Sequence, residues 1–265
     1  MSKITSSRSP GGRLLTIEWM DGLAAPAAYL EDIARHDGGD GYVVVAENTP
    51  LPDVLPAGKR DDGTLFVGFL LRPVIPPARG GMLPVLAALA LTKAIRRHST
   101  HDPQIRWVSD VYAGKQKIAT VSTRAALKPS GAFRYATVNL SLRITQSFAG
   151  SLHEVVQSIF SSQRESLYER VAETLITEFF TLYESFATSD STAFLDEYRE
   201  LSLLRGKRIR FLRDGKRIRA TVFGIDDSAR LIVTPHHGKS VVLSSVSELY
   251  DPKAARLAAK KAETR

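Results

Sequence analysis

The spacing of apolar residues changes its period along the chain, and these changes predict the order of the first elements. Alternating apolar and polar residues over 14–20 predict a strand, and an apolar run over 42–46 predicts a strand that is buried on both faces. Between them a helix is expected to begin at Pro26, since proline is favoured in the first helical turn. After a loop with three prolines at 47–64, a further strand is predicted over 65–71.

Helical periodicity governs two longer segments. Residues 82–98 are apolar around most of the helical circumference, so this helix is expected to lie deep in the core. A stripe of large apolar side chains recurs at steps of three or four over 164–187, which is typical of a core-facing helix. Shorter helices are predicted over 151–160 and 192–203.

Residues 105–124 predict a β-hairpin in the middle of the chain. One strand leads to a tight turn at 113–115, and a second strand returns from it. Asp110 and Lys117 lie close to the turn among apolar neighbours. We expect the hairpin to hold this carboxylate and this amine a fixed distance apart at the mouth of a cleft, which suits anion binding. A plain hairpin with solvated charges is the alternative interpretation.

The last part of the chain switches to a period of two. After a long strand predicted over 133–144 and the helices, four short alternating segments separated by turns begin at residue 205. Such a meander closes into a small barrel. The expected fold class is therefore α+β, with a mixed β-sheet packed against helices and followed by a small β-barrel.

Composition excludes several kinds of chemistry. The 265-residue chain is long enough for one sizeable core and a small second domain. It contains no cysteine, which excludes disulfides, thiolate metal sites and a cysteine nucleophile. Its six histidines show no H-E-x-x-H spacing, and neither G-x-x-x-x-G-K-[ST] nor G-x-S-x-G occurs. Metal hydrolases, P-loop proteins and serine hydrolases can be set aside.

Two segments bear on localisation. Residues 1–12 lack the apolar core of a signal peptide and are expected to be a disordered leader. The most apolar run, residues 82–91, is about half as long as a bilayer-spanning helix and is expected to be a buried helix. With the absence of cysteine, these features predict a cytoplasmic protein.

The formal net charge of +8 is unevenly distributed. Much of it lies in residues 205–219 and in a basic tail at 251–265, which is expected to be a frayed helix. Basic segments of this kind can bind nucleic acid, although a solvated basic hairpin is the commoner outcome. Phe211 is the one aromatic residue within 205–219, so aromatic residues do not alternate with the charges there.

Three motifs resemble the biotin–protein ligase family. Trp107, Asp110 and Lys117-Ile118-Ala119 resemble its W-P-N-D…K-[IL]-A-G segment, with the same seven-residue step from Asp to Lys. Leu70-Leu71-Arg72-Pro73 resembles the L-R-P end of a strand in that family. The third motif is Gly224-Ile225-Asp226 with Leu231-Ile232-Val233, which resembles the G-I-D…G-x-L-L signature of the family's C-terminal SH3-like domain.

The resemblance implies a biotin/lipoate ligase-like domain at 13–203 and an SH3-like barrel at 204–250. The pairing of these domains argues against the related lipoate ligases, whose appended domain differs. No helix-turn-helix pattern precedes Leu14, so the DNA-binding domain of the bifunctional ligase-repressors is not expected.

The resemblance also implies a reaction and its residues. The family joins biotin to ATP, used with Mg²⁺, as biotinyl-adenylate and transfers biotin to a lysine of a biotin carboxyl carrier protein; its members often form homodimers through the sheet. Lys117 would be the catalytic residue that binds the biotin carboxylate and then the adenylate phosphate, with Asp110 and Trp107 in the pocket. The remaining implied binding residues are Lys59, Arg60 and Gly63 in the loop at 47–64, and Ser141 at the Asn of the family's G-x-G-x-N.

The chain departs from the family pattern at several positions. Val108-Ser109 replaces Pro-Asn, Thr120 replaces a glycine, and NTPLPDVLPAGKRDDGT replaces the loop G-R-G-R-x-G-R-x-W. Thr137 and Asn139 stand where the family has the two glycines of G-x-G-x-N. Three functions stay open: an active ligase, a degenerate homologue that keeps binding without turnover, and a nucleic-acid-binding protein that uses the basic barrel.

Overall fold

The computed structural model describes residues 2–36, 38–49, 64–99, 102–144, 164–189 and 192–250. The chain divides into two compact units, Met1–Leu201 and Ser202–Arg265. The predicted helix at 151–160, the loop residues 50–63 and the tail at 251–265 lie outside the described residues.

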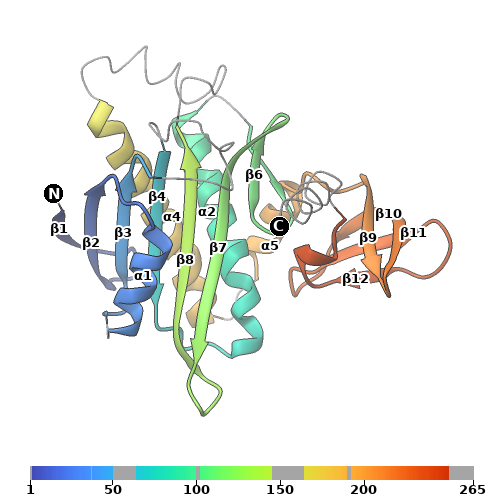
Figure 1. The fold of residues 1–265 in the computed structure, drawn as a ribbon, viewed down its shortest axis with the longest axis horizontal. Coiled ribbons are helices and arrows are strands. Elements are labelled where there is room, and N and C mark those ends of the chain that lie inside the picture. The colour runs from blue at the N-terminus through green and yellow to red at the C-terminus, as the bar shows by residue number, and fades with distance from the viewer. Residues whose placement is uncertain are drawn as a thin grey trace, which may run out of the picture. The chain divides into compact units, whose positions relative to one another are not determined.

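The first unit is built on an eight-stranded mixed sheet with the order β1-β2-β3-β4-β8-β7-β6-β5 (Figure 1). Among the described strands of this sheet only the β2–β3 pair is parallel, and α1 (Pro26–Arg35) connects these two strands. The strands are β1 (Lys3–Arg8), β2 (Leu14–Asp21), β3 (Tyr42–Glu47), β4 (Thr64–Leu71), β5 (Gln104–Arg106), β6 (Asp110–Ala113), β7 (Gln116–Leu127) and β8 (Phe133–Arg143).

Helices cover the two faces of this sheet unequally. α1 lies on one face, while α2 (Leu83–His98) and α4 (Arg164–Ser189) lie on the other (Figure 1). A short 3-10 helix, η1 (Pro77–Met82), precedes α2, and α5 (Phe194–Glu200) packs against α2. We call the two sides the α1 face and the α2/α4 face.

Aromatic side chains hold α4 against the sheet. The Phe69 ring of β4 stacks on Phe179 with 4.1 Å between ring centroids, and its edge meets Phe180 at 5.6 Å. The helical stretch Pro77–His98 is long and apolar enough to cross a membrane, but 67% of its most apolar window is buried inside the protein. Burial of this kind is the behaviour of a core helix, as the sequence predicts.

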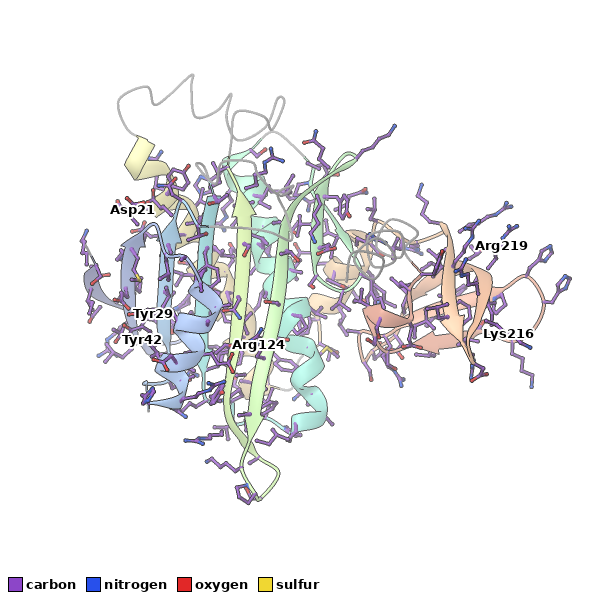
Figure 2. The ribbon with its side chains drawn as sticks, in the orientation of Figure 1. Asp21, Tyr29, Tyr42, Arg124, Lys216 and Arg219 are labelled. Atoms are coloured by element: carbon purple, nitrogen blue, oxygen red, sulfur yellow. The ribbon has the colours of Figure 1, made fainter. Side chains whose placement is uncertain are left out.

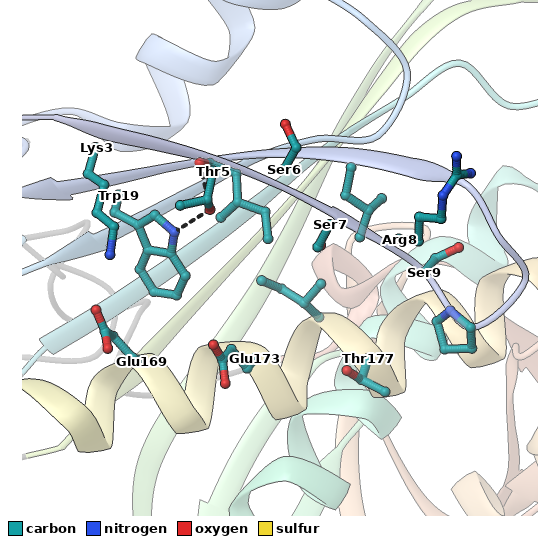
Figure 3. Close-up of a pocket in the computed structure, with 14 residues that line it drawn as sticks. Lys3, Thr5, Ser6, Ser7, Arg8, Ser9, Trp19, Glu169, Glu173 and Thr177 are labelled. Carbon is teal, nitrogen blue, oxygen red and sulfur yellow. Dashed lines mark hydrogen bonds between the residues drawn. The ribbon is translucent and has the colours of Figure 1, made fainter.

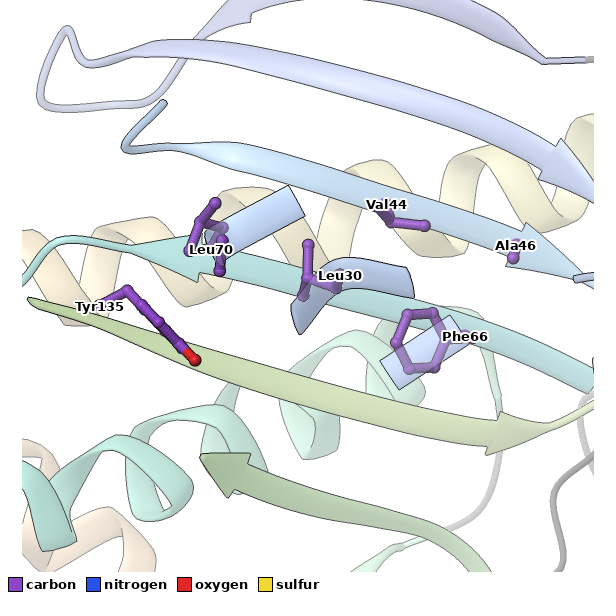
Figure 4. Packing of buried hydrophobic residues seen from close by; sticks show 7 residues of the cluster. Leu30, Val44, Ala46, Phe66, Leu70 and Tyr135 are labelled. Atoms are coloured by element: carbon purple, nitrogen blue, oxygen red, sulfur yellow. The ribbon is translucent and has the colours of Figure 1, made fainter. Parts of the chain in front are cut away.

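On the α1 face, Leu30 packs over Gly68 of β4, and the ring of Phe66 lies beside it (Figure 4). A Cβ atom at Gly68 would approach Leu30 Cδ2 and Phe66 Cε1 to 2.8 Å each, closer than carbon atoms can pack. The absence of a side chain at Gly68 therefore lets α1 lie directly on the sheet.

A buried carboxylate fixes the outer end of the α1 face. Glu18 of β2 accepts hydrogen bonds from Tyr42 Oη at 2.8 Å and from Tyr29 Oη at 3.0 Å. Burial is the main cause that raises the pKa of both tyrosines, and the hydrogen bond to Glu18 adds to it. Both phenols consequently stay protonated donors. Figure 2 labels these tyrosines where α1 meets the sheet.

The second unit contains an antiparallel four-stranded sheet with the order β12-β11-β10-β9. Its elements are β9 (Arg208–Arg213), β10 (Lys216–Ile225), β11 (Leu231–Pro235), β12 (Val241–Leu243) and the 3-10 helix η2 (Val246–Glu248). A bridge between Phe211 and Leu249 returns the chain after β12 to β9, as closure into a small barrel requires. The predicted α+β fold class and four-stranded meander are confirmed.

Three expectations about local structure are wrong. The leader is not disordered over Lys3–Arg8, because β1 pairs with β2 and Thr5 Oγ1 accepts a hydrogen bond from Trp19 Nε1 at 3.0 Å. Two short strands, β5 and β6, replace the single strand expected before the hairpin turn, since the chain also reverses at residues 107–109. The last helix of the first unit ends at Glu200 and not near residue 203.

Candidate binding site on the sheet

Lys117 and Asp110 lie side by side on neighbouring strands. Lys117 Nζ is 2.9 Å from Asp110 Oδ1, and the hydroxyl of Thr120 donates a second hydrogen bond to the same oxygen at 2.7 Å. The two charged side chains are 24% and 30% exposed, so the pair borders solvent and is not sealed in the core. An ammonium group has three donors, and Asp110 occupies one of them, which leaves donors for an incoming carboxylate or phosphate.

The hairpin turn places Lys117 on the same face of the sheet as Asp110. Lys117 pairs with Tyr112, which lies two residues from Asp110 on β6, so all three side chains share one face. A β-bulge then shifts the register by one residue, so that Asp110 pairs with Thr120 and Val111 with Ala119. The extra residue in β7, Ile118, is completely buried.

The turn before β6 is held from both sides. Tyr198 of α5 donates a hydrogen bond to the carbonyl of Val108 at 2.5 Å. Ser109 Oγ donates to the carbonyl of Val121 at 2.9 Å, and the amide of Val121 donates to the carbonyl of Ser109 at 3.1 Å. The Val108-Ser109 replacement of Pro-Asn thus forms an ordered turn, under which Trp107 is buried.

The site extends across the α1 face along a row of cross-strand partners. Ser141 lies opposite Thr120 and also opposite Phe66, so Asp110, Thr120, Ser141 and Phe66 form one row over four strands. Because cross-strand partners point to the same face, this row connects the Lys117 pair with the surface beneath α1.

Asn139 occupies the next row of the same face. It lies opposite Gly68 and Ser122, is 4% exposed, and has no hydrogen-bond partner for either amide atom within the described parts of the chain. Thr137, one row further, is also buried with its hydroxyl unpaired there. Buried polar groups without partners are rare, so these atoms are candidates for contact with a ligand.

The structure brings Lys117, Asp110 and Ser141 onto one face, and it buries Trp107 in the core. Lys59, Arg60 and Gly63 lie outside the described residues. Thr120, which stands where the resemblance expects a glycine, is a site residue that the sequence does not indicate. Regular pairing from the turn at Gly114-Lys115 would make Ala119 the partner of Asp110, and the bulge gives that place to Thr120.

A second concavity, of about 460 Å³, lies between β1–β2 and α4 (Figure 3). Its floor includes Ile17 and Trp19, and Glu169 and Glu173 project from α4 at its rim. Ile17 and Trp19 alternate with Glu18, which contacts α1, so this groove lies on the α2/α4 face, opposite the Lys117 pair. The sequence could not indicate it, because β1 was expected to be disordered.

No protein-family model matches the chain. Solved structures do: a biotin protein ligase from Aquifex aeolicus aligns with a TM-score of 0.65 at 16% identity, covering 88% of this chain and 96% of that one. The same ligase in complex with biotin and ATP aligns with a TM-score of 0.64 at 15% identity, covering 88% and 97%. A biotin protein ligase-like protein of unknown function from a Silicibacter species gives 0.63 at 13% identity, covering 90% and 96%. The chain therefore has a biotin protein ligase-like fold.

Proposed function

We propose that this protein is a biotin–[carboxyl carrier protein] ligase. The observation that carries the proposal is the partly exposed ammonium of Lys117, held by Asp110 on the α1 face of a fold shared with biotin protein ligases. A similar ligase has been solved with biotin and ATP, which supports these two substrates. The implied partner is a biotin carboxyl carrier protein, and the implied compartment is the cytoplasm.

In the first proposed step, Lys117 donates hydrogen bonds to the biotin carboxylate and orients one oxygen for attack on the α-phosphorus of ATP. The new bond joins that oxygen to phosphorus, and pyrophosphate leaves with the electrons of the broken phosphoanhydride bond. Negative charge grows on the phosphoryl oxygens, and the Lys117 ammonium stabilises it. Mg²⁺ bound to ATP would neutralise part of the same charge.

In the second step, the amine of the carrier lysine attacks the acyl carbon of the biotinyl-adenylate. AMP leaves with the electrons of the acyl–oxygen bond, the amine loses one proton, and an amide forms. Asp110 and Thr120 act as positioning residues in both steps, because they fix the ammonium. Asn139 offers a buried amide whose donor and acceptor have no partner among the described residues, and these would complement the ureido group of biotin.

The test is incubation of the purified protein with ATP, Mg²⁺, biotin and a biotin carboxyl carrier domain, followed by a streptavidin blot. We expect a signal that Lys117→Ala abolishes. The control Lys128→Ala removes an exposed lysine just past β7 and should leave the signal unchanged. Absence of signal from the folded wild-type protein would reject the ligase proposal.

A degenerate homologue that binds without turnover is the second candidate. The observation in its favour is that Thr137 and Asn139 place buried side chains where the resemblance expects two glycines. Calorimetric titration with biotin, alone and with ATP, separates the candidates. Biotin binding that depends on Lys117, without a product on the streptavidin blot, would establish the second candidate in place of the first.

A further inference from the structure

Four arginines occupy the outward face of the β9–β10 ribbon in the second unit. Burial alternates along β9, where exposed Arg208 and Arg210 alternate with half-buried Ile209 and buried Phe211. It also alternates along β10, where Arg217 and Arg219 are exposed before buried Ala220. We call these four side chains, with Phe223, the arginine face. Figure 2 labels Arg219 among the side chains that extend from β10.

The arginines of this face oppose one another, and no carboxylate of the described residues forms an ion pair with the central ones. Arg210 and Arg219 are direct cross-strand partners, so their Cα atoms are about 4.5–5.5 Å apart. Like charges in this arrangement destabilise a sheet. Among the described residues, no carboxylate forms an ion pair with Arg208, Arg210 or Arg219. Residues 202–250 hold ten Lys or Arg against four Asp or Glu, so the excess charge is not balanced nearby in the sequence.

Two aromatic rings lie on or beside the β9–β10 pair of strands. Phe223 is 73% exposed, two residues beyond exposed Thr221, at a β-bulge between Val222 and Gly224 that gives it no cross-strand partner. Tyr250 lies beside β9, where its amide bonds the carbonyl of Arg210, and the guanidinium of Arg217 lies 4.3 Å from its ring centroid. The aromatic residue noted in the sequence, Phe211, is instead completely buried.

We propose that the arginine face binds single-stranded nucleic acid. Arginines at alternate positions of a strand are spaced by about 6.6–6.8 Å and form a cationic track along the ribbon. An exposed phenyl ring next to such a track provides the stacking platform that unpaired bases use. An acidic protein could use the same arginines, but an exposed ring beside regularly spaced cations is the combination that single strands use, and the oligonucleotide experiments below decide between the two. This binding is independent of the ligase proposal.

The first experiment measures fluorescence anisotropy of a labelled oligothymidylate, and of an oligouridylate, with the full-length protein over a range of salt. If each of the four arginines contacts one phosphate, at about −0.7 per contact, the logarithm of the association constant should fall against the logarithm of the salt concentration with a slope of about −3. Arg210→Glu/Arg219→Glu should weaken binding by at least about tenfold. The control Arg213→Glu/Lys216→Glu changes the net charge equally at the hairpin tip and should weaken it by less than about threefold.

The second experiment separates base stacking from general polyanion binding. Phe223→Ala should weaken oligonucleotide binding by about fivefold or more and leave heparin binding unchanged, whereas Phe223→Tyr should bind as the wild type does. Circular dichroism checks that each variant is folded. The proposal fails if the wild type does not bind, if both charge variants lose affinity equally, or if Phe223→Ala affects both ligands alike. Lys117→Ala should bind the oligonucleotide normally, so the two proposals fail separately.

Discussion

Lys117 Nζ faces Asp110 Oδ1 at 2.9 Å because the turn at Gly114-Lys115 pairs Lys117 with Tyr112. Tyr112 and Asp110 are two residues apart on β6, so the seven-residue step from Asp110 to Lys117 leaves both charges on the α1 face. The bulge at Ile118 then makes Thr120, in place of Ala119, the partner of Asp110. A spacing that sequence comparison treats as a motif is thus also a statement about strand register.

The ion pair itself should contribute little to stability. Asp110→Asn is expected to lower the free energy of unfolding by less than about 1 kcal/mol, because exposed ion pairs are screened by water. The same variant should strongly reduce biotinylation, since the ammonium loses its positioning partner. Urea unfolding and the streptavidin blot measure the two effects. Asp102→Asn, which removes the exposed carboxylate paired with Arg96, is the control and should keep activity. A loss above about 2 kcal/mol for Asp110→Asn would show that the pair is structural.

The buried carboxylate of Glu18 depends on its two phenols. Tyr42→Phe should lower the free energy of unfolding by about 1–3 kcal/mol, because it removes a donor from a charged group that is 5% exposed. Tyr42→Phe keeps the aromatic ring, so the measured loss reports the hydrogen bond and not a loss of packing. Equilibrium urea unfolding provides the measurement, and Tyr250→Phe at the surface of the second unit is the control. A neutral effect of Tyr42→Phe would mean that water replaces the missing donor.

Close packing at Gly68 makes a methyl group there costly. Gly68→Ala should destabilise the protein by about 1–3 kcal/mol, because the new Cβ meets Leu30 and Phe66 at 2.8 Å. A smaller side chain at Leu30 should relieve the clash with the new methyl group. The loss of unfolding free energy in Gly68→Ala/Leu30→Ala should therefore be smaller than the sum of the losses in the two single variants. Thermal unfolding of the three variants tests this coupling. Gly39→Ala, at a position with open space around it, is the control. Strict additivity would contradict the packing argument.

Hydrophobic periodicity was sufficient to predict the elements that fill the core. β3, α2 and α4 have apolar patterns that match the period of their structure, and all three were predicted from these patterns. β1 was missed because KITSSR has a single large apolar residue, and the strand is held by pairing with β2 and not by burial. Its order depends on partners distant in the sequence, including the hydrogen bond from Ser9 to Glu184 of α4.

Alternation predicts the faces of both proposed sites, whereas two bulges set details that periodicity does not reveal. In β9 the alternation of Ile209 and Phe211 with the arginines would have identified Phe211 as inward-facing. Alternation along β10 likewise puts Phe223 outward, but the extra residue at the Val222/Gly224 step is what leaves it without a cross-strand partner. In the same way, the extra residue in β7 sets which residue pairs with Asp110. Composition carries no information about either register shift.

Residue His98 should make the stability of the first unit depend on pH. Its Nε2 lies 2.9 Å from Thr174 Oγ1, and burial lowers the pKa of its imidazole, with further lowering by the charges of Arg170 and Arg97. The folded state therefore favours the neutral ring, whereas the unfolded chain takes up a proton near the ordinary pKa of 6.5. Stability should consequently fall as pH drops below about 6.5 and stop falling below the lowered folded-state pKa.

Replacement of His98 should remove this part of the pH dependence. The His98→Gln variant keeps a polar group that can reach Thr174 but does not titrate, so its unfolding free energy should change less between pH 7 and pH 5 than that of the wild type. Urea unfolding at several pH values gives both profiles. His36→Gln removes an exposed histidine at the end of α1 and serves as the control. If the unfolding free energies of wild type and His98→Gln change in parallel with pH, His98 has the same pKa in the folded and unfolded states. That result would contradict the lowering of its pKa by burial.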